Sequence, residues 1–177
     1  MSLVKDKPTN PAPGWFARGN NPKDYDIGSD RQVPYTGKAS GYIKNRAKKP
    51  EGFGTLMQSF SGKPYLNERI KLSAYIKSEN VEDKAWLWLR VDGSCRRMLS
   101  FDNMHNRPIN GTNDWQCYEV VLDVPQATVN IAFGVGLSGK GHVWVDKFQF
   151  EKVSLEVPTT NLLVDEPQNL DFDEVES

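Results

Sequence analysis

Apolar and polar residues alternate with a period of two in many short segments of the chain. In residues 85–92 (AWLWLRVD), leucine and valine alternate with Trp86, Trp88 and Arg90. Successive side chains of a strand point to opposite faces, so this pattern predicts a strand whose apolar face packs on a core. The other face of the strand would carry two tryptophans and a guanidinium group.

No window of twelve residues shows the apolar stripe and the caps of a helix, whereas Gly, Pro, Asn and Asp separate the alternating segments. We expect eight strands and a weaker ninth near residues 25–27. The eight cover residues 40–46, 55–61, 70–78, 85–92, 98–103, 115–124, 128–138 and 142–152. This pattern predicts an all-β fold, a two-layer antiparallel β-sandwich of the jelly-roll type.

A face suited to ligand binding is predicted where two of these strands meet. The segment between residues 78 and 84 is short enough for a hairpin, which would bring Tyr75 beside Trp86, Trp88 and Arg90. The outer face of residues 130–138 holds mainly alanine and glycine, which leaves room above that strand. Flat rings beside polar groups suit the C–H faces and hydroxyls of a sugar.

Two other interpretations of the tryptophan face stay open at this point. A loop or the chain's own tail would cover Trp86 and Trp88 as a second small core, because protein surfaces rarely leave two indoles bare. Alternatively, the same face docks another protein chain, as in a homodimer.

The two ends of the chain differ from the predicted sandwich, which covers residues 14–153. Residues 1–13 are proline-rich and predict an extended arm. Residues 154–177 form an acidic tail in which 169–173 (NLDFD) alternates once more. We expect this segment to return to the sandwich as a strand with Leu170 and Phe172 buried; a frayed tail is the alternative.

Within the last predicted strand the alternation changes phase. Phe148 and Phe150 are out of step with Val143 and Val145. A bulge near residues 146–147 would restore the phase, because it adds one residue to one strand.

Length, charge and cysteines narrow the function classes. A chain of 177 residues fits one domain, and it has no apolar run long enough to span a membrane. We expect a cytoplasmic protein, or an extracellular one if residues 1–3 replaced a natural leader. Cys95 and Cys117 lack metal-ligand spacing and are expected to be free thiols, with a single disulfide as the alternative.

Nucleic-acid binding and catalysis are both poorly supported by the sequence. Seven of the 23 acidic residues lie in residues 154–177, but the basic residues of the remainder are scattered, apart from a cluster in 44–49 that fits a solvated loop. His105 and His142 are isolated, and no motif pairs two carboxylates. We therefore expect no contact with nucleic acid and no enzymatic activity.

Several segments together resemble the galactose-binding-like jelly-roll superfamily, which includes many carbohydrate-binding modules. The segments are Gly14–Phe16, Thr55–Phe60, Ile70–Lys77, Trp115–Val124 and Val143–Phe148. The resemblance implies that Gln58 faces the binding groove and that Asp146 holds a structural calcium ion. It supports a non-catalytic module that binds a saccharide or a similar small polar ligand through Trp86, Trp88, Arg90, Tyr75 and Gln58.

A narrower similarity involves Phe101–Met104, Arg107–Ile109 and Gly111–Thr112. These segments resemble a bacterial group often labelled transcriptional regulators, although the chain shows no helix-turn-helix pattern. The alternative function is therefore a sensor or interaction domain associated with such a regulator. The superfamily commonly begins with a strand similar to residues 169–173, so the tail would take that strand's place, in its own chain or in a swapped dimer.

Overall fold

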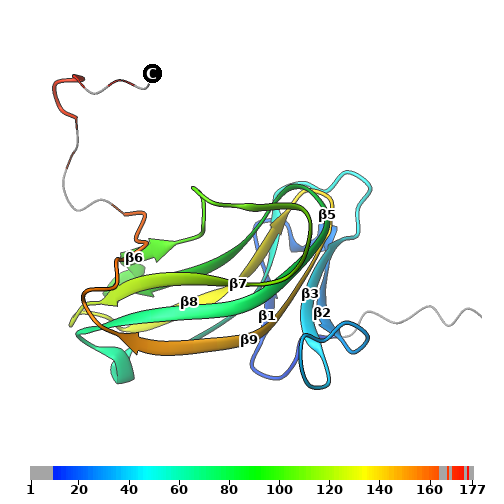
Figure 1. Cartoon of the computed structure of the whole chain (residues 1–177), viewed down its shortest axis with the longest axis horizontal. Coiled ribbons are helices and arrows are strands. Elements are labelled where there is room, and N and C mark those ends of the chain that lie inside the picture. The colour runs from blue at the N-terminus through cyan, green and yellow to red at the C-terminus, as the bar shows by residue number, and fades with distance from the viewer. Residues whose placement is uncertain (1–9, 164–166, 168, 174, 176–177) are drawn as a thin grey trace, which may run out of the picture.

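The computed structural model describes residues 10–163, 167, 169–173 and 175, and strands dominate it (Figure 1). The strands are β1 (Phe16–Arg18), β2 (Tyr25–Asp30), β3 (Ser40–Asn45), β4 (Phe53–Ser61), β5 (Glu68–Asp92), β6 (Met98–Asp102), β7 (Ile109–Val124), β8 (Asn130–Ser138) and β9 (His142–Val153). Three short 3₁₀ helices, η1 (Pro22–Asp24), η2 (Lys63–Tyr65) and η3 (Ser94–Arg96), connect some of them. In the described part of the chain, no helix is long and apolar enough to cross a membrane.

The long strand β5 belongs to both layers of the sandwich. Its first half pairs with β7 and β9, and its second half pairs with β6 and β8. The first sheet therefore has the order β7-β5-β9-β3-β2, and the second has the order β6-β5-β8-β4-β1. All pairings are antiparallel, which confirms the predicted two-layer β-sandwich.

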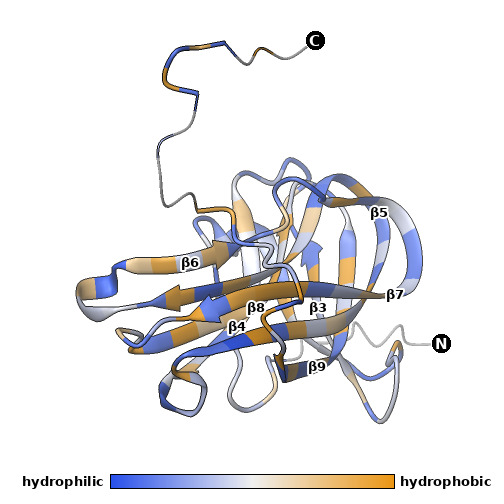
Figure 2. Ribbon diagram, turned by 60° about the vertical axis from the view of Figure 1, so that its left-hand side comes forward, coloured by the Kyte–Doolittle hydropathy of each residue, from blue (hydrophilic) through white to orange (hydrophobic). Residues whose placement is uncertain are grey.

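The core lies between the two sheets and draws on both halves of β5. Leu72 and Ile76 in the first half, and Leu87 and Leu89 in the second, are at most 1% exposed and share one apolar cluster. The alternation of apolar and polar residues is visible along the strands in Figure 2. The inward positions change from even to odd numbers near Asn80, whose φ of 52° adds an irregularity at that point.

The predicted strands are confirmed, but the predicted hairpin at residues 78–84 is wrong. Ser78, Asn80 and Asp83 are typical turn residues. In the structure the strand continues through them, because neighbouring strands pair with β5 on both sides of this point. Tyr75 and Trp86 consequently lie in different sheets.

The predicted bulge in β9 is confirmed. Tyr75 pairs with Asp146 and Ser73 pairs with Gln149, so β9 has one extra residue there. Lys147 takes up this residue with a φ of 56°. Phe148 and Phe150 then point inward and pack against the core, as the change of phase required.

The chain leaves the sandwich after β9 along the edges of β7 and β6. Thr160 N–H donates to the carbonyl of Val121, and Leu162 N–H donates to that of Phe101. The predicted strand at residues 169–173 is not formed, because Leu170 and Phe172 lie at a turn and are 75% and 81% exposed. Five alternating residues gain strand hydrogen bonds only beside a partner strand, and none of the pairings in the described chain includes them.

A stack of rings covers part of the outer face of the first sheet. The rings of His142 and Trp144 are stacked, with centroids 3.6 Å apart. Trp144 Nε1 donates a hydrogen bond to Asp30 Oδ2 at 2.9 Å. Burial, reinforced by the positive charge of Lys44 and opposed by Asp30, lowers the pKa of His142 to about 4. The folded protein therefore favours neutral His142.

We predict that acidification weakens the fold through His142. The unfolded chain binds this proton near pH 6.5, whereas the folded chain binds it only near pH 4, so stability is lost as the pH falls between these values. We expect a loss of about 2 kcal/mol in the free energy of unfolding, measured by urea titration at both pH values. His142→Gln should remove most of this pH dependence, and an unchanged slope would contradict the assignment.

Candidate functional site

The outer face of the second sheet consists of side-chain rows that run across the strands. Directly opposed residues of an antiparallel pair share a face. In one row Trp86 is opposite Gly136 of β8, which is opposite Thr55 of β4. The next row consists of Trp88, Gly134 and Met57.

The indole of Trp86 packs against the backbone of β8 at Gly136. A Cβ atom placed on Gly136 would be 2.3 Å from Cε2 of Trp86, so the ring occupies the space that a side chain at position 136 would need. Phe53 contacts the indole edge-to-face with ring centroids 5.7 Å apart, and the Lys84 ammonium lies 5.7 Å from the ring centroid. The predicted room above β8 is therefore taken up by Trp86 itself.

Trp88 reaches across β8 and is held by a hydrogen bond. Its Nε1 donates to Oγ1 of Thr55 at 2.9 Å, and Thr55 Oγ1 donates to the carbonyl of Val135 at 2.7 Å. Only 8% of Trp88 is exposed. Trp88 thus forms part of a fixed floor, whereas Trp86 keeps a larger share of its surface accessible.

A groove of about 310 Å³ lies over this floor. Its lining residues are Arg18, Gly19, Phe53, Thr55, Met57, Trp86, Trp88, Arg90, Phe101 and Asn103. No described residue after β9 is among them, so the interpretation that the tail covers the tryptophans has no support in the described chain.

The polar groups of the groove are cationic or neutral. Asp92, which is 6% exposed, accepts a hydrogen bond from Nε of Arg90 at 3.0 Å and fixes the guanidinium beside the indoles. A guanidinium has five N–H donors, and this ion pair uses the one on Nε. Arg18 lies at the opposite end of the same face, on β1.

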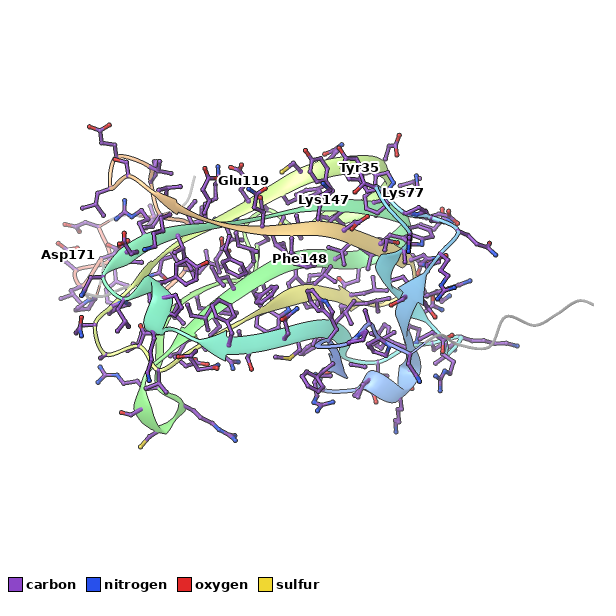
Figure 3. All side chains as sticks on the ribbon, turned by 90° about the horizontal axis from the view of Figure 1, so that it is seen from below. Tyr35, Lys77, Glu119, Lys147, Phe148 and Asp171 are labelled. Carbon is purple, nitrogen blue, oxygen red and sulfur yellow. The ribbon has the colours of Figure 1, made fainter. Side chains whose placement is uncertain are left out.

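The structure brings together three of the five predicted ligand-binding residues, Trp86, Trp88 and Arg90. Tyr75 lies on the outer face of the first sheet, on the other side of the sandwich. Its ring stacks on Tyr35 with centroids 4.0 Å apart, and Tyr35 in turn contacts Trp115. Figure 3 shows Tyr35 on this outer side with Lys77 nearby. The predicted platform of three rings is therefore wrong with respect to Tyr75.

Gln58 also lies outside the groove. It shares the inward-facing side of β4 with Leu56, whereas Thr55 and Met57 point outward. Gln58 lines a separate cavity between the sheets, beside Phe133 and Phe148. The resemblance assigned Gln58 to the groove, but the alternation along β4 places it on the opposite face.

The surroundings of Asp146 do not fit the expected calcium ion. Asp146 Oδ2 accepts hydrogen bonds from the backbone N–H groups of Tyr35 and Thr36, each at 3.1 Å, and Oδ1 accepts one from Lys147. These N–H groups direct positive charge at the oxygens that a cation would need. Among the described residues, no group of three or more His, Cys, Asp or Glu side chains is placed to hold a metal.

Sequence reasoning missed several groove residues. Thr55 and Met57 could have been found from the alternation of β4, since they lie on the opposite face from the inward-facing Leu56. Phe53 and Phe101 depend on strand order, which a single sequence does not reveal. Asn103 accepts a hydrogen bond from His105 N–H, as expected of a turn residue, and also lines the groove.

One similar sequence belongs to a bacterial protein. The chain is 47% identical over 167 residues to an "Uncharacterized HTH-type transcriptional regulator YbfP" of Bacillus subtilis (strain 168). This match covers 91% of the chain but only 57% of the relative, so the chain spans little more than half of that protein. No protein-family model matches the chain.

Several solved structures share the fold. One is the CBM22-1 xylan-binding domain of Xyn10C from Paenibacillus barcinonensis, with a TM-score of 0.59, 17% identity and coverage of 82% of this chain and 89% of that one. Another is a family 16 carbohydrate-binding module, with a TM-score of 0.56, 13% identity and coverage of 75% and 92%. These similarities confirm the jelly-roll fold.

We predict that the two outward-facing glycines of β8, Gly134 and Gly136, differ in their tolerance of alanine. A Cβ at Gly134 would lie 2.2 Å from the backbone oxygen of Leu56, whereas one at Gly136 meets the side chain of Trp86, which can move. We expect Gly134→Ala to cost about 3 kcal/mol and Gly136→Ala about 1 kcal/mol of unfolding free energy. Urea unfolding of both variants would test this, and a larger cost at Gly136 would contradict the packing described.

Proposed function

We propose that the chain is a non-catalytic module that binds a saccharide in the groove on the second sheet. The observation that carries this proposal is Trp86, a partly exposed indole packed against Gly136 in the groove that Arg90 also lines. A flat ring covers the C–H face of a sugar, and fixed donors bond its hydroxyls. Xylan is the first ligand to test, because one neighbour in fold is named a xylan-binding domain.

Binding without catalysis is supported by the composition of the groove. Glycoside hydrolysis generally uses two carboxyl groups on either side of the scissile bond. The residues that line the groove include neither Asp nor Glu. The adjacent carboxylate of Asp92 is already paired with Arg90.

The relative named as a transcriptional regulator favours a second candidate function. In this alternative the module is the ligand-sensing part of a longer regulator. The same groove would bind the ligand, so both candidates predict saccharide binding. A docking role for the tryptophan face is less supported, because Trp88 is largely buried within its own chain.

Substitution of Trp86 tests the proposed groove. We expect the wild-type chain to bind xylo-oligosaccharides with a Kd in the millimolar to micromolar range, measured by isothermal titration calorimetry. Trp86→Ala should weaken binding about tenfold or more. The matched control is Trp115→Ala, which removes an indole from the other outer face and should leave Kd unchanged. Equal losses in both variants would contradict the proposal.

The cationic lining predicts a preference for acidic saccharides. Two arginines and no carboxylate line the groove, so a xylan bearing glucuronic acid should bind several-fold more tightly than a neutral xylan. Added salt should reduce the difference by screening, and Arg90→Gln should reduce it at low salt. Equal affinities at every salt concentration would contradict this preference.

A further inference from the structure

Strand β9 has an unpaired edge. On one side it pairs with β5 from His142 to Val153, whereas on the other side only His142–Val145 pair, with β3. Among the described residues, no strand lies beside residues 147–153 on that second side. An unpaired edge presents backbone N–H and carbonyl groups that can bind another strand.

An apolar cavity of about 430 Å³ opens beneath this edge, between the two sheets. Its walls include Trp15, Leu56, Phe133, Phe148 and Phe150. The rings contact one another, with centroids 4.8 Å apart for Trp15 with Phe148 and for Phe133 with Phe150. Figure 3 shows Phe148 on the inner side of β9 and Lys147 on its outer side. A strand added here would therefore direct alternate side chains into an apolar space.

The chain carries a segment with the matching pattern. Leu170 and Phe172 are 75% and 81% exposed and alternate with Asp171 and Asp173. In an extended conformation both apolar side chains would lie on one face and the carboxylates on the other. Pairing with β9 would bury the apolar pair in the cavity and direct the acids to the side of the exposed Lys147.

The N-terminal arm contributes Ala12 to the wall of this cavity but is a poorer partner for strand pairing along the edge of β9. Pro8, Pro11 and Pro13 have no backbone N–H and so cannot donate to a ladder. The tail segment contains no proline between residues 168 and 177.

The path of the chain favours exchange between two copies. The chain leaves the body at Leu162, which is bonded to Phe101 of β6. Strands β5 and β8 separate β6 from β4, which lines the cavity. Figure 1 shows the chain leaving the body beside β6, and Figure 3 shows Asp171 well apart from Phe148. The chain therefore leaves the body on one side of β5, whereas the open edge of β9 lies on the other side, which favours the cavity of a second copy.

We propose that two copies of this chain exchange their C-terminal segments. Residues 169–173 of each copy pair with the open edge of β9 in the other, and Leu170 and Phe172 fill its cavity. The two contacts are identical and related by a twofold axis, so the assembly closes as a dimer. This proposal is independent of the saccharide groove.

Light scattering after size-exclusion chromatography of the full chain tests the exchange. We expect a mass about twice the 20.0 kDa of one chain. The Leu170→Asp/Phe172→Asp double variant should halve that mass. The matched control, Val129→Asp/Leu155→Asp, changes two apolar residues that are 57% and 73% exposed elsewhere and should stay dimeric.

Hydrogen exchange at β9 separates the remaining outcomes. Amides of residues 147–153 that face the open edge should be protected in the wild type and exposed in the tail double variant. A wild-type monomer with an unprotected edge overturns the proposal. If the wild type is a monomer and its β9 amides lose protection in the tail variant, the tail docks in its own chain and the exchange is overturned. A dimer that the tail substitutions leave intact also overturns the exchange.

Discussion

The backbone hydrogen bonds of β5 are the constraint on which the rest of the fold depends. This one strand of 25 residues pairs with β6, β7, β8 and β9 and so belongs to both sheets. Where the strand passes between the layers, near Asn80, the inward-facing residues change from even-numbered to odd-numbered positions. As a result, the outward side chains of its two halves lie on opposite surfaces of the molecule, Tyr75 on one and Trp86 on the other.

The groove depends on a second constraint, the two glycines at outward positions 134 and 136 of β8. Gly134 and Gly136 weaken a strand, since they contribute no side-chain packing of their own. They allow the backbone of β4 and the indole of Trp86 to approach closely, and Trp88 spans the same strand to reach Thr55. The result is an aromatic surface held in place by packing and by one buried hydrogen bond. A preformed surface of this kind loses little conformational entropy when it binds a ligand.

Much of the fold could be predicted from the local alternation of apolar and polar residues, because successive side chains of a strand point to opposite faces of a sheet. The strands, the inward residues of each half of β5 and the bulge at Lys147 followed from this pattern. Strand continuity did not, since Asn80 adopts the turn-like φ of 52° within a strand whose course is decided by distant neighbours. The site residues also fall into a predictable and an unpredictable group. Trp86, Trp88 and Arg90 could be predicted because they alternate within one short segment. Phe53 and Phe101 could not, because they line the groove only as a result of the strand order. Leu170 and Phe172 show the limit of alternation, because their segment pairs with no strand among the described residues of its own chain.

The exposed face of Trp86 is the proposed binding surface for a saccharide. The most direct measurement is the set of indole N–H signals of the five tryptophans in a ¹H–¹⁵N NMR spectrum during titration with a xylo-oligosaccharide. We expect a saturable shift of the Trp86 signal, whereas the signals of Trp115 and Trp144 on the first sheet should not move. A titration that moves Trp115 and leaves Trp86 in place would contradict it.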